Sequence, residues 1–223
     1  MTVRNGFIDS VYCGSGVDGK GLRVVVFLCG CNLRCKFCHN PETLYKKGNE
    51  VTAEEVYEKC LKYKAYIRRG GVTLSGGEPF LQKEFCLELI KLLHSADIHV
   101  LTETNGQIAD EELILANDGF IVDVKNQETD DLAAYDKFLS LCDKFKKPVT
   151  LTNVLIPEVN GEKGKIRALS GLKDRHECVE KIKFLPFHKM CAEKYERLGE
   201  KFLYSDKREP ADEDLSAAYE NLL

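Results

Sequence analysis

Short runs of β-branched and other apolar residues recur along the chain and predict six buried strands. The runs are bounded mostly by glycine, proline or charged residues, a pattern typical of strands that are covered on both faces. The predicted strands are Leu22–Leu28, Val72–Leu74, His99–Thr102, Phe120–Val124, Val149–Ile156 and Val179–Leu185.

The segments between these runs carry helical periodicity. Apolar side chains return every three or four positions over residues 85–93 and 132–142, as on the buried face of an amphipathic helix. Thr52 and Glu55 have the spacing of a capping box, so a further helix is expected to begin after Thr52. Strand and helix alternate, which predicts an α/β protein with parallel strands and outer helices.

Several polar residues, a glycine and a cysteine fall at or just after the ends of the predicted strands. In parallel α/β folds, functional sites gather at the carboxyl ends of the strands. We therefore expect one rim of the fold to hold the site. The residues at these positions include Cys31, Gly76, Glu78, Glu103, Asn105, Lys125 and His188.

Length and composition are those of a single compact domain. The 223 residues are 43% apolar and 30% charged, enough to bury one core, so we expect one domain over 1–223. The 32 basic and 36 acidic residues are interspersed, with a net charge of −4 and no polybasic block to bind nucleic acid. No run approaches the roughly 18 apolar residues that a membrane span needs.

Three of the ten cysteines lie within eight residues, at Cys31, Cys35 and Cys38. Without a secretory signal, clustered thiols point to a reducing compartment, where they bind metal more often than they form disulfides. We therefore expect a cytoplasmic protein. Closed zinc sites and ordinary cubane clusters take four protein ligands, whereas three ligands leave one metal open to a ligand from outside.

An iron with an open position can chelate the amino and carboxylate groups of S-adenosylmethionine (SAM). One electron from the reduced cluster then breaks the sulfonium C–S bond, and the 5′-deoxyadenosyl radical abstracts hydrogen from a substrate. The simpler alternative is a zinc site with Cys29 or His39 as a fourth ligand. The role of Cys29 stays open, whereas His39, next to Cys38, is expected to shape the loop. The remaining cysteines are expected to be small buried hydrophobes: Cys13, Cys60, Cys86, Cys142, Cys178 and Cys191.

The segment Gly30–Glu42 reads Gly-Cys-Asn-Leu-Arg-Cys-Lys-Phe-Cys-His-Asn-Pro-Glu and resembles the glycyl radical enzyme activating family. The Cys-x-x-x-Cys-x-x-Cys pattern alone is similar to radical SAM enzymes in general, whereas Cys-His-Asn-Pro-Glu is similar to the activating subgroup. Asp18–Arg23 and Ser75–Pro79 match the family as well. The resemblance covers residues 7–188 and implies a partial (β/α)6 barrel that binds a [4Fe–4S] cluster and SAM.

The resemblance also implies roles for individual residues. The three clustered cysteines would bind the iron–sulfur cluster. In the Gly-Gly-Glu segment, glycine lets the backbone approach SAM, and the carboxylate pairs with its ammonium group. The residues implied to surround SAM are Phe37, Cys38, His39, Gly76, Gly77, Glu78, Glu103, Asn105, Asp123, Val124, Lys125 and His188.

Three positions depart from the family pattern. Glu103 replaces an aspartate, which lengthens the carboxylate by one methylene where relatives hold a monovalent cation. Thr152 stands where an arginine is usual, so a fixed charge and five donors are lost near the substrate side. Lys20 replaces a proline. The departures leave the cofactor motifs intact and affect the side that faces the partner.

The implied activity is removal of a Cα hydrogen from a glycine of a partner glycyl radical enzyme. That glycine must lie on a flexible segment, because a folded one cannot reach a SAM molecule buried in a barrel. Only Cys60 lies between Cys38 and Gly76, whereas relatives with an inserted ferredoxin-like segment carry further cysteine groups there. This favours the single-cluster, pyruvate formate-lyase type, and we expect a monomer reduced by flavodoxin or ferredoxin.

Three other functions stay open at this point. The nearest alternative is an activase of anaerobic ribonucleotide reductase, although such activases are usually shorter than this chain. A radical SAM small-molecule enzyme, such as a deazaguanine-forming synthase, would show Cys-Asp-Thr in place of Cys-His-Asn-Pro. An electron carrier or metal-stabilised binding protein predicts a fourth cluster ligand and no SAM binding.

Residues 190–223 are expected to form a helical tail. Charged residues alternate with Tyr195 and Leu198 at helical spacing, which is typical of a solvated capping helix. Contact with the partner protein is the alternative role.

Overall fold

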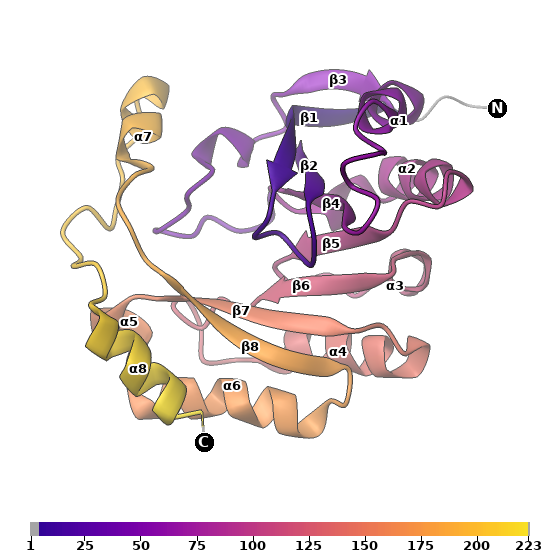
Figure 1. The fold of residues 1–223 in the computed structure, drawn as a ribbon. Helices are drawn as coiled ribbons and strands as arrows, with labels where there is room; N and C mark the ends of the chain where they lie inside the picture. Colours follow the sequence, from indigo (N-terminus) through magenta and orange to yellow (C-terminus); the bar gives the residue numbers. More distant parts are fainter. Residues whose placement is uncertain (1–4, 223) are drawn as a thin grey trace. The chain divides into compact units, whose positions relative to one another are not determined.

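The computed structural model describes residues 5–222 and is a mixed α/β fold with a mostly parallel sheet (Figure 1). The strand order is β3-β1-β2-β4-β5-β6-β7-β8. The strands are β1 (Asn5–Ser15), β2 (Arg23–Leu28), β3 (Asn49–Thr52), β4 (Gly71–Gly76), β5 (Val100–Thr104), β6 (Gly119–Asp123), β7 (Val149–Leu155) and β8 (Val179–Pro186).

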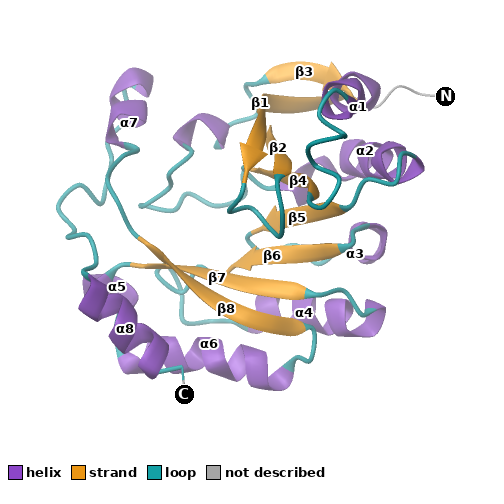
Figure 2. Ribbon diagram, in the orientation of Figure 1, coloured by secondary structure: helices purple, strands orange, loops and turns teal. Residues whose placement is uncertain are grey.

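Helices alternate with the strands over most of the chain (Figure 2). The capping box is confirmed, because Thr52 Oγ1 accepts from Glu55 N–H at 3.1 Å and Glu55 Oε2 accepts from Thr52 N–H at 2.9 Å. No helix within residues 5–222 is both long and apolar enough to cross a membrane. The helices are α1 (Ala53–Leu61), α2 (Lys83–Ser95), α3 (Glu111–Ala116), α4 (Ala133–Phe145), α5 (Pro157–Asn160), α6 (Lys163–Arg175), α7 (Ala192–Leu198) and α8 (Asp212–Glu220), with short 3-10 turns η1 (Pro41–Thr43) and η2 (Pro79–Gln82).

All six predicted strands are present among the described residues, but β8 is mostly exposed rather than buried, with only Val179 and Phe184 buried. Two further strands, β1 and β3, were not predicted. β1 pairs antiparallel with both β2 and β3, whereas the predicted strands pair in parallel in β2–β4, β4–β5 and β7–β8, which confirms the predicted fold class. Buried positions alternate with exposed or half-buried ones in the first half of β1, and Gly6, Asp9 and Ser10 interrupt its apolar pattern. β3 has four residues, of which only Val51 is buried and apolar. Neither strand therefore has the continuous apolar run on which the prediction depended.

The contacts group the chain into two compact units, each made of three chain segments. Unit 1 comprises the segments up to Leu33, Glu42–Thr104 and Asp110–Ile121, and unit 2 comprises Arg34–Pro41, Asn105–Ala109 and Val122–Leu223.

In unit 1, the register of β2 and β4 places the start of the cysteine loop beside the glycines of β4. The two strands run parallel, with Val24 opposite Val72 and Leu28 opposite Gly76. The valines of β2 and β4 are fully buried, which fixes this register. Gly76 therefore ends β4 next to Leu28, from which the chain leaves the sheet toward Cys31.

In unit 2, β7 and β8 run parallel, and α6 and α8 pack on β8 (Figure 1). Phe184 of β8 meets Tyr219 of α8 edge to face, with ring centroids 5.1 Å apart. The tail after residue 190 contains α7 and α8 with irregular chain between them, so the predicted helical tail is present but interrupted.

The cysteines outside the cluster motif are mostly core residues, as predicted. Cys60, Cys86, Cys142, Cys178 and Cys191 are all buried. The sixth is an exception and corrects the expectation: Cys13 is half-buried, because it lies in the part of β1 where exposed and half-buried positions alternate.

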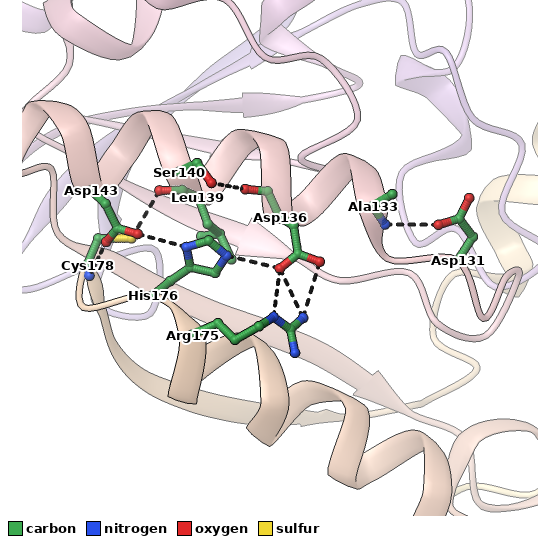
Figure 3. A network of polar contacts seen from close by, with 9 residues as sticks. All are labelled: Asp131, Ala133, Asp136, Leu139, Ser140, Asp143, Arg175, His176 and Cys178. Carbon is green, nitrogen blue, oxygen red and sulfur yellow. Dashed lines mark hydrogen bonds and ion pairs between the residues drawn. The ribbon is translucent and has the colours of Figure 1, made fainter.

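A buried histidine joins α4 to the chain between α6 and β8 (Figure 3). The His176 ring, 7% exposed, contacts Asp143 Oδ2 through Nδ1 at 2.7 Å and Asp136 Oδ1 through Nε2 at 3.0 Å. Asp143 also accepts from the Cys178 N–H at 2.7 Å, and Arg175 donates two hydrogen bonds to Asp136. Both carboxylates of α4 thus bind the connection between α6 and β8.

These contacts predict a loss of stability in acid. Burial acts to raise the pKa of Asp136 and Asp143, but the hydrogen bonds from His176, with Arg175 at Asp136 and Cys178 at Asp143, lower it overall. A carboxyl with a depressed folded-state pKa stabilises the protein above its unfolded pKa of about 3.9, and this contribution is lost as the pH falls through the folded value. We expect Asp143→Asn to cost about 1–2 kcal/mol at pH 7 and to flatten the acid limb of stability between about pH 4 and the lower folded pKa.

Urea unfolding at a series of pH values checks this prediction. Asp174→Asn is the matched control, because Asp174 is exposed on the same α6 helix that leads to His176. Equal pH dependence in the two variants would show that the Asp143 contacts do not stabilise the fold.

Candidate functional site

The first part of the cysteine loop leaves the sheet through a glycine turn in unit 1. Gly30 has φ +98°, which favours glycine, and its N–H donates to Thr43 O at 2.8 Å. The Cys31 N–H donates to Leu44 O at 3.1 Å, and the Leu33 N–H lies 3.4 Å from Cys31 Sγ. These bonds hold the backbone of the first cysteine while its side chain stays half-buried.

Cys29 is a core residue of unit 1. Its side chain is 1% exposed, and a Cβ placed on Gly48 would come within 2.6 Å of its Sγ. Burial, followed by the Asp9 and Glu42 carboxylates, raises the pKa of the Cys29 thiol to about 11. The thiol therefore keeps its proton and fills the space beside Gly48.

The Gly-Gly-Glu segment lies against the start of the cysteine loop. The Gly77 N–H donates to Leu28 O and the Glu78 N–H donates to Gly30 O, both at 2.8 Å. Gly76 has φ +110°. A Cβ on Gly77 would meet Gly30 O at 2.1 Å and Thr43 O at 2.8 Å, so only glycine fits there. The backbone of Gly77 and Glu78 thus lies close to the backbone of Gly30, the residue that precedes Cys31.

Two carboxylates at the ends of β4 and β5 bind strand hydroxyls. Glu78 is fully buried, and its Oε1 accepts from Thr104 Oγ1 at 2.8 Å and from the Phe80 N–H at 3.1 Å, which caps η2. Glu103 Oε2 accepts from Ser75 Oγ at 2.6 Å. Both carboxylates have a structural role in unit 1, and the ammonium partner implied for Glu78 stays a prediction.

The second part of the cysteine loop belongs to unit 2. The Cys38 N–H donates to Cys35 O at 3.1 Å, which closes a turn between the two cysteines. The Lys36 N–H donates to Glu128 Oε1 at 3.2 Å. Phe37 is 2% exposed and belongs to an apolar cluster, against which Cys35 also packs. The turn therefore has one buried anchor and two half-buried thiols.

Asp123, at the end of β6, and Lys125, just after it, set the charge beside these thiols. Lys125 Nζ pairs with Asp123 Oδ2 and lies 5.1 Å from the Phe37 ring centroid. Burial raises the pKa of the Cys35 thiol to about 12, and the Lys125 cation opposes this shift. Burial acts to lower the pKa of Lys125, but Asp123 and Cys35 raise it overall, so Lys125 stays charged. Asp123 Oδ1 is buried and has no hydrogen-bond partner among the described residues.

Two histidines stack behind Cys38. The rings of His39 and His188 lie 4.1 Å apart at 22°, and His39 Nε2 donates to His188 O at 2.9 Å. Burial, followed by the charge of His188, lowers the pKa of His39 to about 4, so His39 is neutral at pH 7. The buried Nδ1 atom of His188 has no hydrogen-bond partner within residues 5–222.

Two further predicted residues of unit 2, Asn105 and Val124, make hydrogen bonds with backbone groups. Asn105 Oδ1 accepts from the Gln107 N–H at 3.1 Å, and Gly106 between them has φ +68°. Val124 is fully buried, and its N–H donates to Thr152 O at 2.8 Å. Thr152 Oγ1 is a further buried atom without a partner in the described part of the chain.

The predicted site residues divide between the two units. The donor set fits the implied cofactors: soft thiolates suit iron–sulfur clusters, a glycine-lined backbone admits a close ligand, and the buried Asp123 Oδ1 and His188 Nδ1 atoms can each take a polar partner. Unit 1 holds Cys31, Gly76, Gly77, Glu78 and Glu103. Unit 2 holds Cys35, Phe37, Cys38, His39, Asn105, Asp123, Val124, Lys125 and His188.

Contact between the tail and the cysteine loop was not predicted from the sequence. Tyr195 Oη donates to Cys38 O at 3.1 Å, and Lys194 Nζ donates to His39 O at 3.0 Å. The pattern predicted only an amphipathic helix here. The one available signal was the recurrence of aromatic residues between Phe187 and Tyr204, which is unusual for a solvated tail.

Comparison with known proteins identifies the family. Residues 17–143 match the family described as a 4Fe-4S single cluster domain. The pyruvate formate-lyase-activating enzyme of Clostridium pasteurianum is 37% identical over 87% of this chain and 87% of its own length. The enzyme of the same name from Staphylococcus epidermidis is 33% identical over 96% of this chain and 94% of its own length.

Solved structures share the fold at low sequence identity. A domain of the pyruvate formate-lyase-activating enzyme from Bacteroides vulgatus has a TM-score of 0.53 at 22% identity, covering 69% of this chain and 92% of that domain. A radical SAM methyltransferase from Sphaerobacter thermophilus has a TM-score of 0.62 at 17% identity, covering 90% of this chain and 63% of that enzyme. These likenesses establish the partial barrel fold of radical SAM enzymes.

Fold and cysteine motif together define a radical SAM enzyme with a [4Fe–4S] cluster and SAM as cofactors. Within this class, the chain belongs to the pyruvate formate-lyase-activating enzyme family.

Proposed function

We propose that this chain activates a glycyl radical enzyme of the pyruvate formate-lyase type by removing a Cα hydrogen from one of its glycines. The observation that carries the proposal is the hydrogen bond from the Glu78 N–H to Gly30 O at 2.8 Å. It fixes the Gly-Gly-Glu backbone beside the residue that precedes Cys31. The glycines of this segment permit close approach of a ligand to the backbone near the start of the cysteine loop.

Three thiols would hold the cluster and leave one iron for SAM. Cys31, Cys35 and Cys38 are all half-buried, whereas Cys29 lies in the core with a raised thiol pKa. This contrast favours the three-cysteine cluster over a zinc site that uses Cys29. The neutral His39 ring donates to a backbone carbonyl, which supports its predicted role in shaping the loop.

When bound, the reduced cluster supplies one electron for cleavage of SAM, which yields the hydrogen-abstracting radical. The chain's own residues orient the cofactor. We assign the methionine end of SAM to Gly76, Gly77 and Glu78, where glycine permits close backbone approach. The buried Asp123 Oδ1 and His188 Nδ1 atoms are assigned as polar contacts to SAM.

The substrate would be a flexible segment of the partner that becomes ordered on docking. We further propose one catalytic domain, because each unit is built from three segments that alternate along the chain. Reduced flavodoxin or ferredoxin is the proposed electron donor to a monomeric enzyme. Ten cysteines, none of them in a disulfide among the described residues, support a cytoplasmic location.

Anaerobic reconstitution with iron and sulfide, followed by dithionite reduction with SAM, tests the function. We expect 5′-deoxyadenosine to form, with more product when a glycine-loop peptide is present. A full-length pyruvate formate-lyase should then show a glycyl doublet in its EPR spectrum. Cluster assembly without any deoxyadenosine would instead indicate an electron carrier.

A further inference from the structure

The C-terminal tail binds the backbone of the loop that carries Cys35 and Cys38. Tyr195 Oη donates to Cys38 O at 3.1 Å. On the same helix, Lys194 Nζ donates to His39 O and to Asn40 Oδ1, both at 3.0 Å. Neighbouring residues of α7 therefore contact three consecutive residues of the loop.

Aromatic packing joins the same two segments. Phe37, between the two cysteines, stacks on Tyr204 with ring centroids 6.2 Å apart. The ring centroids of Tyr195 and Phe202 lie 5.1 Å apart, and those of Phe202 and Phe187 lie 6.2 Å apart. All these side chains belong to one buried apolar cluster, which consists of Phe37, Val154, Ile156, Phe187, Cys191, Tyr195, Phe202 and Tyr204.

The loop needs such support because it has little regular structure of its own. Residues 35–40 form neither helix nor strand, and one turn bond runs from the Cys38 N–H to Cys35 O. Backbone carbonyls near a buried site must find donors, and an unsatisfied one is costly. The tail supplies two such donors, and the Lys194 donor brings a positive charge to the loop.

We propose that Tyr195 and Lys194 are positioning residues, which hold the Cys35–Asn40 loop in its cluster-binding conformation. The proposal rests on the proposed function, because it takes Cys35 and Cys38 as cluster ligands. Lys194 also places a cation beside a site that gains negative charge on reduction. Charge and hydrogen bonds near a cluster set its reduction potential, so the Lys194 cation favours the reduced state.

A tail that merely capped the fold would behave differently. Its substitutions would lower overall stability and leave the loop no more mobile than the rest of unit 2. The distinguishing measurements are therefore local to the loop or specific to the cluster.

Tyr195→Phe removes one hydrogen bond to the loop, and Lys194→Gln removes the cation that donates to His39 O and Asn40 Oδ1. Lys194→Arg keeps the charge and the donors. Tyr219→Phe is the matched control for Tyr195→Phe, because it removes an equivalent hydroxyl from the same tail. The Tyr219 hydroxyl accepts a hydrogen bond from the Phe184 N–H at 3.1 Å. Lys201→Gln is the control for Lys194→Gln, because Lys201 is exposed on the same tail.

Hydrogen exchange of residues 35–40 in the cluster-free protein is the first readout. The second readout is the release of iron from the reconstituted protein to a chelator. The third is an EPR-monitored redox titration of the reconstituted protein. We expect Tyr195→Phe to speed loop exchange and iron release about tenfold. Lys194→Gln should shift the potential to a more negative value, and Lys194→Arg should restore it.

The proposal is overturned if Tyr195→Phe and Lys194→Gln match their controls in all three readouts. It is also overturned if Tyr219→Phe speeds iron release as much as Tyr195→Phe, since the effect would then belong to the tail in general. A wild-type protein that took up no cluster would refute the proposed function, while loop exchange would still decide the positioning role.

Discussion

Replacing Cys35 with alanine should abolish cluster assembly and SAM cleavage. With Cys31 and Cys38 alone, the cluster would have two protein thiolates instead of three, and a second iron would lose its thiolate. Thiolate is the ligand that holds iron in such clusters. The same loss is expected for alanine at Cys31 and at Cys38.

The measurement is iron content and 5′-deoxyadenosine formation after anaerobic reconstitution of each variant. Cys13→Ala is the matched control, because Cys13 is a half-buried thiol in β1, outside the cysteine motif. It should keep full cluster content and activity. Turnover retained in any of the three loop variants would contradict the assignment of the cluster ligands.

Replacing Gly77 with alanine should damage both fold and cofactor binding. The added Cβ would lie 2.1 Å from Gly30 O and 2.8 Å from Thr43 O, and both are backbone atoms that cannot rotate away. The Gly-Gly-Glu segment must therefore move off the start of the cysteine loop. Overpacking of this kind costs about 3 kcal/mol, at the upper end of the usual range. We expect SAM affinity to fall at least about tenfold, because the backbone approach to the ligand is lost.

Urea unfolding of the cluster-free protein and SAM binding to the reconstituted protein check the two effects separately. Gly164→Ala is the control, because a Cβ there meets nothing within 4 Å and the residue lies in α6. That variant should be unchanged or slightly more stable, since alanine is the better helix former. A Gly77→Ala protein with wild-type stability and SAM affinity would refute the close-approach role of Gly77.

Most of the central sheet could be predicted because β2, β4, β6 and β7 are buried along most of their length. Val24, Val25 and Val26 in β2 leave no polar position, and such runs read as strands from sequence alone. β1 and β3 could not be predicted in this way. Their stability comes from pairing at the edge of the sheet, and Asp9 and Glu50 are compatible with that position but carry no apolar signal.

The candidate site could be predicted where its chemistry is local in sequence. The cysteine triplet and Gly76–Glu78 are recognisable because their spacing and residue types are themselves the signal. The buried hydrogen bond from Thr104 to Glu78 could not be foreseen, since it depends on the pairing of β4 with β5. The contact between Tyr195 and Cys38 spans 157 positions, and no local pattern reports a contact of that range.

This long span also bears on when the enzyme can mature. During synthesis the chain emerges from its N-terminus, so Cys38 leaves the ribosome long before Tyr195 and Tyr204 are made. Until then, the Cys38 carbonyl lacks its Tyr195 donor, and Phe37 lacks the aromatic side chains against which it packs. We therefore expect iron delivery to the loop to follow synthesis of α7 and Tyr204.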